Sequence, residues 1–198
     1  MSLWEATTTD ESKPKYLTKE EKRDVYATEE GWVKRTTGTG GRAGRVHEET
    51  LVAIGDLHGG DSAVEGLGAG TISAVSLGTT ELTAAGGVFE VKVHFNEQVT
   101  ISTASPLMVL TNDQTGGGTS ANFTLTMDGA LPQTNNTFTF STTIPGAGEV
   151  AVNDVLSVAA QTINDNGATV KDFGTTLDSS LVINAAAVSL TGTVTVGA

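Results

Sequence analysis

Short segments in which apolar and polar residues alternate strictly fill the chain after residue 71, and this feature limits the possible fold more than any other. In "VFEVKVHF", Phe89, Val91, Val93 and Phe95 fall on one face of an extended strand, while polar residues dominate the positions between them. A strand of this kind buries one face and leaves the other in solvent.

The same alternation recurs in "ANFTLTM", where Phe123, Leu125 and Met127 share a face, and in "TFTFS". Gly, Asn and Asp clusters such as "NDQTGGG" and "NDNG" separate these segments and mark turns. Several short alternating strands joined by such turns predict an all-β, immunoglobulin-like antiparallel sandwich.

Composition excludes several other classes of protein. The 198 residues contain no cysteine, which rules out disulfides and thiolate metal sites. No segment approaches the ~18 continuous apolar residues of a membrane span. The N-terminus lacks the basic start and apolar stretch of a signal peptide, so we expect a protein that stays where it is made.

Charge divides the chain into two unlike parts. Nine of the 11 basic residues lie within residues 1–45, whereas 15 of the 23 acidic residues follow them. Nucleic-acid binding needs a basic face, so the acidic part argues against such a partner. We expect no membrane and no nucleic acid among the partners.

These differences predict three parts. Residues 1–58 are expected to be an extended, mostly irregular arm, because isolated apolar residues cannot bury enough surface to fold alone. Within the arm, Thr18 and Glu21 have the spacing of a capping box, which predicts a short helix. Residues 59–70 are expected to be a Gly-rich linker, and residues 71–198 the sandwich.

Residues 82–184 resemble the bacterial Ig-like domains of surface-layer and adhesin-type proteins. The resemblance rests on "VKVHFNEQVTI" (91–101), on the segment 156–165 and on "VKDFGTTLDSSLVI" (170–183). It implies an Ig-like sandwich. Thr175 stands where the family usually has Asn, which weakens the case for calcium at that turn.

The arm resembles virion structural proteins of marine tailed phages, including cyanophages. Three blocks in order carry this resemblance: "MSLW", "KPKYL" and "GWVKRTTGTGGRAGRVHEETLVAIG", within residues 1–56. It implies an arm that lies extended on a virus particle.

The arm supplies the candidate partner-binding residues. Aromatic and Arg side chains dominate interface energetics, so the aromatic residues are expected to anchor in a neighbouring subunit and the basic ones to pair with its carboxylates. These residues are Trp4, Tyr16, Tyr26, Trp32, Lys34, Arg35, Arg42 and Arg45. The alternative for the aromatic residues is packing onto their own domain.

Two motifs suggest catalysis but lack their context. "GDLHGG" reads like the first metal motif of the metallophosphoesterases, yet beyond Asp56 and His58 the remaining motifs are absent. "GTGGRAG" lacks the strand and helix of a dinucleotide site. Asp165, Asp172 and Asp178 would have to converge to bind calcium, and turn chemistry explains them equally well. We therefore expect no catalytic residues, no bound metal and no cofactor.

Together these observations predict a capsid decoration protein of the cement or knob type that is not an enzyme. Its arm is expected to dock on the major capsid protein or a neighbouring virion subunit. The sandwich of residues 71–198, called the body below, is expected to project outward. We expect assembly in the host cytoplasm, a place on the capsid surface, and association with sister chains. The alternative is a neck or tail accessory protein, or an adhesion module for a host-surface ligand.

Overall fold

A computed structural model describes residues 13–14, 16–37, 46–54, 57, 68–146, 148–175 and 177–198. These residues form β-strands and turns, and helical structure among them is limited to one short 3-10 turn, η2 (Glu21–Asp24). The predicted all-β class is therefore confirmed. None of the helices in the described residues has the length and apolarity needed to cross a bilayer.

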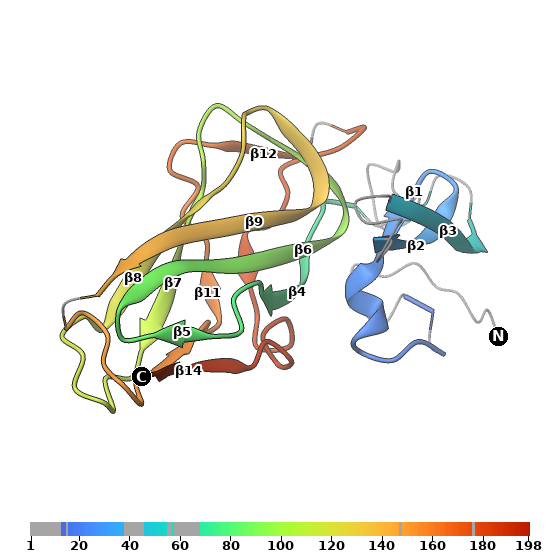
Figure 1. Ribbon diagram of the computed structural model, residues 1–198. Helices are drawn as coiled ribbons and strands as arrows, with labels where there is room; N and C mark the ends of the chain where they lie inside the picture. Colours follow the sequence, from blue (N-terminus) through green and yellow to red (C-terminus); the bar gives the residue numbers. More distant parts are fainter. Residues whose placement is uncertain are drawn as a thin grey trace.

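The strands differ widely in length, from two residues in β5 to 17 in β6 (Figure 1). Their bounds are β1 Val25–Thr28, β2 Gly31–Thr37, β3 Val46–Ala53, β4 Ile72–Leu77, β5 Leu82–Thr83, β6 Gly86–Ser102, β7 Leu107–Asn112, β8 Asn122–Met127, β9 Gln133–Pro145, β10 Val155–Ser157, β11 Gln161–Thr162, β12 Thr169–Asp172, β13 Val182–Ile183 and β14 Thr193–Gly197.

Seven strands of the body join edge to edge in a closed circuit. The order is β6, β5, β14, β10, β7, β8 and β9, and β9 pairs again with β6. All of these pairs are antiparallel except β14 with β5, which is parallel. The sequence did not reveal this closure, because it depends on two-residue and three-residue strands that carry no alternation of their own.

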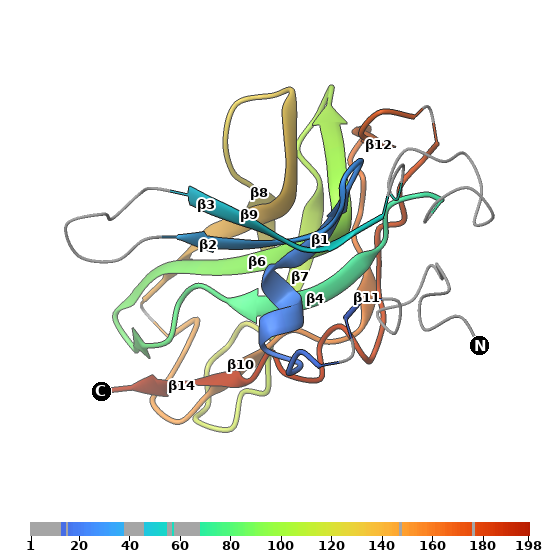
Figure 2. The same ribbon diagram turned by 90° about the vertical axis from the view of Figure 1, so that its right-hand side faces the viewer.

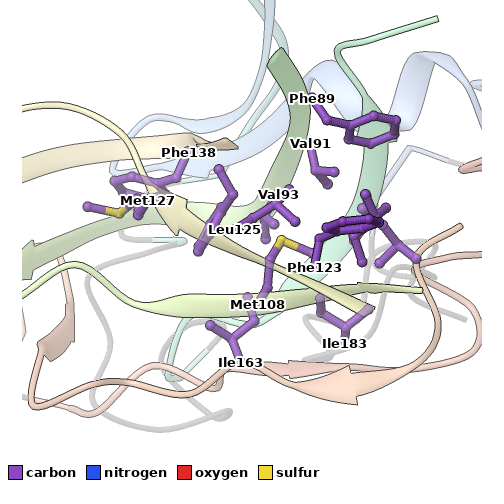
Figure 3. Close-up of a cluster of buried hydrophobic side chains, with 14 of the residues drawn as sticks. Phe89, Val91, Val93, Met108, Phe123, Leu125, Met127, Phe138, Ile163 and Ile183 are labelled. Carbon is purple, nitrogen blue, oxygen red and sulfur yellow. The ribbon is translucent and has the colours of Figure 1, made fainter. Parts of the chain in front are cut away.

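The interior of the circuit is the main hydrophobic core. Phe89, Val91 and Val93 on β6 are buried, and Phe123 and Leu125 on β8 face them, as the alternation predicted (Figure 3). The Phe95 and Phe138 rings from β6 and β9 meet edge to face, with their centroids 5.9 Å apart. This geometry adds about 0.5–1.5 kcal/mol beyond burial alone.

Residues 25–53 were expected to be mostly irregular, and this prediction was wrong. Strands β1, β2 and β3 form a three-stranded antiparallel meander, here called the N-terminal sheet. β1 attaches it to the body through a parallel bridge between Ala27 and Glu97 of β6. The physical reason is that backbone groups of β6 complete a sheet that this segment cannot stabilise alone.

The predicted capping box is present, but the helix that it starts is short. Glu21 accepts from the Thr18 backbone N–H at 3.0 Å, and Thr18 Oγ1 accepts from the Glu21 N–H at 3.2 Å. The chain continues as the 3-10 turn η2 and then enters β1 at Val25, where it pairs with β2. Figure 2 shows η2 in front of β4, beyond one end of the N-terminal sheet.

Candidate partner-binding surface

The first face of the N-terminal sheet packs into a small core of its own. Trp32 lies opposite Ala27 in the β1–β2 ladder, and both are buried with Val25 and Leu57. Trp32 is only 1% exposed. The large ring supplies most of the apolar area that this short sheet can bury, so it stabilises the sheet from within.

The opposite face carries a stack of polar and aromatic side chains. The Arg35 guanidinium lies over the Tyr26 ring, 5.2 Å from its centroid, and the Tyr26 hydroxyl donates to Glu48 Oε1 at 2.7 Å. Burial, and then the bond to Glu48, raise the pKa of Tyr26 to about 12. The Tyr26 bond and the Arg35 guanidinium lower the pKa of Glu48, which therefore keeps its charge.

Arg35 also joins the N-terminal sheet to the body. Its Nη1 donates to Asn135 Oδ1 at 2.7 Å and to Asn136 Oδ1 at 2.9 Å, both on β9. Its Nε and Nη2 donate to Glu48 Oε1 at 3.2 and 3.0 Å. The planar fork of Arg can serve both sets of acceptors at once, which the ammonium group of Lys cannot do.

A second set of contacts holds η2 against the body and the sheet. The Arg23 guanidinium donates to the backbone oxygen of Leu190 at 2.5 Å. Lys34 on β2 forms an ion pair with Glu21 at 3.2 Å. Besides the Ala27–Glu97 bridge, side chains of the N-terminal segment thus bind the body at two further places, the Leu190 turn and the Asn135–Asn136 pair.

The structure therefore places most of the described candidate residues in contacts within the chain. Tyr26 and Trp32 are buried, and Lys34 and Arg35 form ion pairs with neighbouring carboxylates. Tyr16 is the candidate with an open side chain among the described residues, at 66% exposed. Trp4, Arg42 and Arg45 lie outside the described residues.

Strand β3 is the outer edge of the N-terminal sheet. Among the described strands it pairs only with β2, so one row of its backbone groups faces away from the protein. Residues Val46–Thr50 are exposed on both faces of the strand, and the Val46 side chain is 56% exposed. A strand with a free edge and open faces is a template for pairing with another chain.

A polar cleft of about 480 Å³ lies between the N-terminal sheet and β6 and β9. Its lining residues are Asp24, Arg35, Thr36, Lys92, His94, Asn136 and Thr137. The sequence placed His94 on the polar face of its strand, and the N-terminal segment covers that face. The sequence does not predict this cleft, because the N-terminal segment that covers His94 lies far from it along the chain.

His94 is held in its neutral form at this cleft. Its Nε2 lies 2.8 Å from Ser76 Oγ and its Nδ1 lies 3.1 Å from Thr137 Oγ1. Burial lowers the pKa of His94 to about 4, and the positive charges of Lys13, Arg23 and Lys92 add to this effect. At neutral pH one ring nitrogen donates and the other accepts, which matches two hydroxyl partners.

The motifs that suggested catalysis or metal binding do not form sites in the described residues. Asp56, His58 and "GTGGRAG" lie outside the described residues. Leu57, which stands between Asp56 and His58, is described and packs in the small core. Asp165 accepts from the Gly167 N–H in its own turn at 3.2 Å, and Asp178 pairs with Lys171 at 2.6 Å. In the described part of the chain, no three His, Asp or Glu side chains gather as metal ligands do.

Comparisons with protein-family models, with curated proteins and with solved structures found no match.

Proposed function

We propose that this protein is a structural component of a phage particle, acting as a capsid decoration protein without enzymatic activity. Its N-terminal sheet docks on the major capsid protein or a neighbouring virion subunit, and its body projects outward. The observation that carries the proposal is the β3 edge, which is open along its backbone and on both faces over Val46–Thr50.

An open strand edge binds by adding a strand from the partner. Main-chain hydrogen bonds supply the affinity in this mode, and side chains on alternate positions supply the specificity. The connection between β2 and β3 contains Arg42 and Arg45, which would pair with carboxylates of the partner. Tyr16 would add an aromatic contact. The resemblance of residues 1–56 to phage virion proteins points to the same kind of partner.

The body suits an outward position. In this proposal it is an Ig-like unit, in line with the resemblance of residues 82–184 and with the antiparallel order β7, β8, β9, β6. It carries the acidic charge of the chain, with Lys92 and Lys171 as the basic residues after position 45. Like-charged bodies repel one another, which keeps neighbouring copies on a particle apart.

Two proline variants of β3 test this docking mode. Neighbouring residues of a strand direct their N–H groups to opposite sides, so one of Glu49→Pro and Thr50→Pro removes a donor from the free edge. The other removes a donor from the β2–β3 ladder and serves as the matched control. The variant that keeps the wild-type melting temperature identifies the free-edge position.

Attachment is measured by co-sedimentation of the full-length protein with purified capsids that lack it. The free-edge variant is expected to lose attachment while its melting temperature stays unchanged. Wild-type attachment by that variant would contradict docking through β3. Attachment to host cells but not to capsids by the wild-type protein would instead support the adhesion alternative.

A further inference from the structure

A small pocket of about 90 Å³ lies where the N-terminal segment meets the body. One wall consists of Lys22 and Arg23 of η2 with Lys19 just before it, and the other consists of β4 and the turn at residues 186–190. Figure 2 shows η2 in front of β4 in this region. Pockets for drug-sized ligands measure about 300–1,000 Å³, so this pocket suits a group of only a few atoms.

The charged side chains described at this pocket are all basic. Lys19, Lys22 and Arg23 form no ion pair with a carboxylate in the described part of the chain, whereas the adjacent Glu21 is already paired with Lys34. The protein has a net charge of −12, so this gathering of positive charge runs against its overall charge. Basic groups that share a small pocket repel one another, and an anion between them offsets the repulsion.

Hydrogen bonds to backbone oxygens hold the basic wall in place. The Arg23 guanidinium donates from Nη2 to the backbone oxygen of Leu190 at 2.5 Å, and its other N–H groups have no partner among the described residues. The Lys13 ammonium is 1% exposed and donates to the backbone oxygen of Lys22 at 2.8 Å, which adds a fourth positive charge beside η2. The wall is thus positioned before a ligand arrives, which lowers the entropic cost of binding.

We propose that this pocket binds a phosphate group. A phosphate monoester carries about −1.5 to −2 charges at pH 7 and three strong acceptor oxygens, which match the three basic side chains. A carboxylate supplies one charge and two oxygens, so it would leave part of the positive charge unpaired. The hydroxyls of Ser73 and Ser189 already donate to the backbone oxygens of His94 and Ala186, so the ammonium and guanidinium groups are the donors for the ligand.

A phosphate group in this pocket would strengthen the attachment of η2 to the body. Arg23 already joins η2 to the Leu190 turn, and a bound anion would neutralise the basic groups that line this junction. The described lining residues include none from β3. This inference therefore stands apart from the proposal that β3 docks on a capsid, and either can fail without the other.

The test titrates the full-length protein with sodium phosphate in a low-salt buffer at pH 7.5 and measures the heat of binding. We expect one phosphate per chain, with an affinity that falls as NaCl is added. The melting temperature should rise by roughly 5–10 °C when free phosphate is about 100 times its Kd. Sodium acetate, which tests the carboxylate alternative, should bind at least about tenfold more weakly.

Lys22→Met should weaken phosphate binding about tenfold or more, because it removes one charged donor. The Lys22 ammonium has no partner among the described residues, and its backbone oxygen still accepts from Lys13, so the variant should keep the fold. Lys19→Met, at an exposed position before η2, gives a second test with the same expected direction. Lys92→Met is the matched control, because it removes the same charge from a different cleft and should bind like the wild type.

Glycerol 3-phosphate distinguishes two sources of the phosphate. Binding as tight as that of inorganic phosphate would assign the pocket to a phosphate group of a larger molecule, and binding of inorganic phosphate alone would assign it to the free ion. Three results would overturn the proposal: no phosphate binding by the wild type at millimolar concentration, equal affinity for acetate, or wild-type affinity in both Lys22→Met and Lys19→Met.

Discussion

Arg35 of β2 donates from Nη1 to the side-chain oxygen of Asn136 on β9 at 2.9 Å, which joins two parts of the chain that are 101 residues apart. The same guanidinium binds Asn135 and Glu48 and covers the Tyr26 ring. One side chain therefore links the N-terminal sheet to the body and also orders the polar face of that sheet.

Arg35→Lys should loosen the N-terminal sheet. Lysine keeps the charge but cannot serve the acceptors on β9 and Glu48 together, so we expect a loss of about 1–2 kcal/mol in unfolding free energy. Urea denaturation measures the loss, and limited proteolysis should show faster cleavage before residue 54. Lys171→Met is the control, because it breaks only the exposed pair with Asp178 and should cost less than about 1 kcal/mol. Equal effects of the two substitutions would contradict the role given to Arg35.

Trp32→Ala should unfold the N-terminal sheet while the body stays folded. Removing a buried Trp costs about 3–5 kcal/mol, and the small core that Trp32 shares with Val25, Ala27 and Leu57 has little else to replace it. Hydrogen exchange should show protection lost in β1 to β3 and kept in β6 and β9. Tyr16→Ala, which truncates an exposed side chain, should leave the exchange pattern unchanged.

His94 should make the protein less stable in mild acid. Its pKa is about 4 in the folded protein and near 6.5 when unfolded, so the unfolded chain binds the extra proton between these values. The contribution of neutral His94 to the free energy of unfolding is complete above about pH 6.5. It falls by up to about 3 kcal/mol as the pH drops toward 4. Thermal melts of His94→Gln across this range should show a flatter profile than those of the wild type. The exposed His47→Gln should retain the wild-type profile.

Glu97 should have the opposite effect at high pH. Its pKa is raised from 4.5 to about 9. The contribution of protonated Glu97 to the free energy of unfolding is therefore complete below about pH 4.5 and is lost as the pH rises toward 9. Glu97→Gln should be more stable than the wild type by on the order of 3 kcal/mol at pH 7. Urea melts from pH 5 to 9 measure this difference. A variant less stable than the wild type at pH 8 would contradict the buried, protonated state of Glu97.

The sequence predicted the core strands because alternation is a local signal. Phe89 to Phe95, Phe123 to Met127, and Phe138 with Phe140 are buried in the way that their spacing indicated. The same alternation, continued from Phe95 to Val99, would also have placed Glu97 on the core face. A polar residue at an apolar position was the available sign of this buried carboxylate.

The N-terminal strands could not be predicted in this way. Tyr26 and Trp32 looked like anchors for another subunit, because the segment around them lacks apolar periodicity. Trp32 instead packs with Val25, Ala27 and Leu57, and Tyr26 contacts Arg35 and Glu48. The contacts of the sheet with β6 and β9, which follow much later in the chain, come from Ala27 and Arg35. The body circuit depends in the same way on β5 and β14, whose pairing joins distant segments.

This pairing of β5 with β14 also affects how the chain reaches its native state. β14 comes from the far end of the described chain and fits between β5 and β10. Before it arrives, both neighbours carry unpaired backbone groups, and structures dominated by distant strand pairing fold over milliseconds to seconds. During that interval the half-finished molecule can associate with other nascent copies. The yield of usable protein at high expression will therefore depend more on the rate of synthesis and on temperature than on the stability of the finished fold.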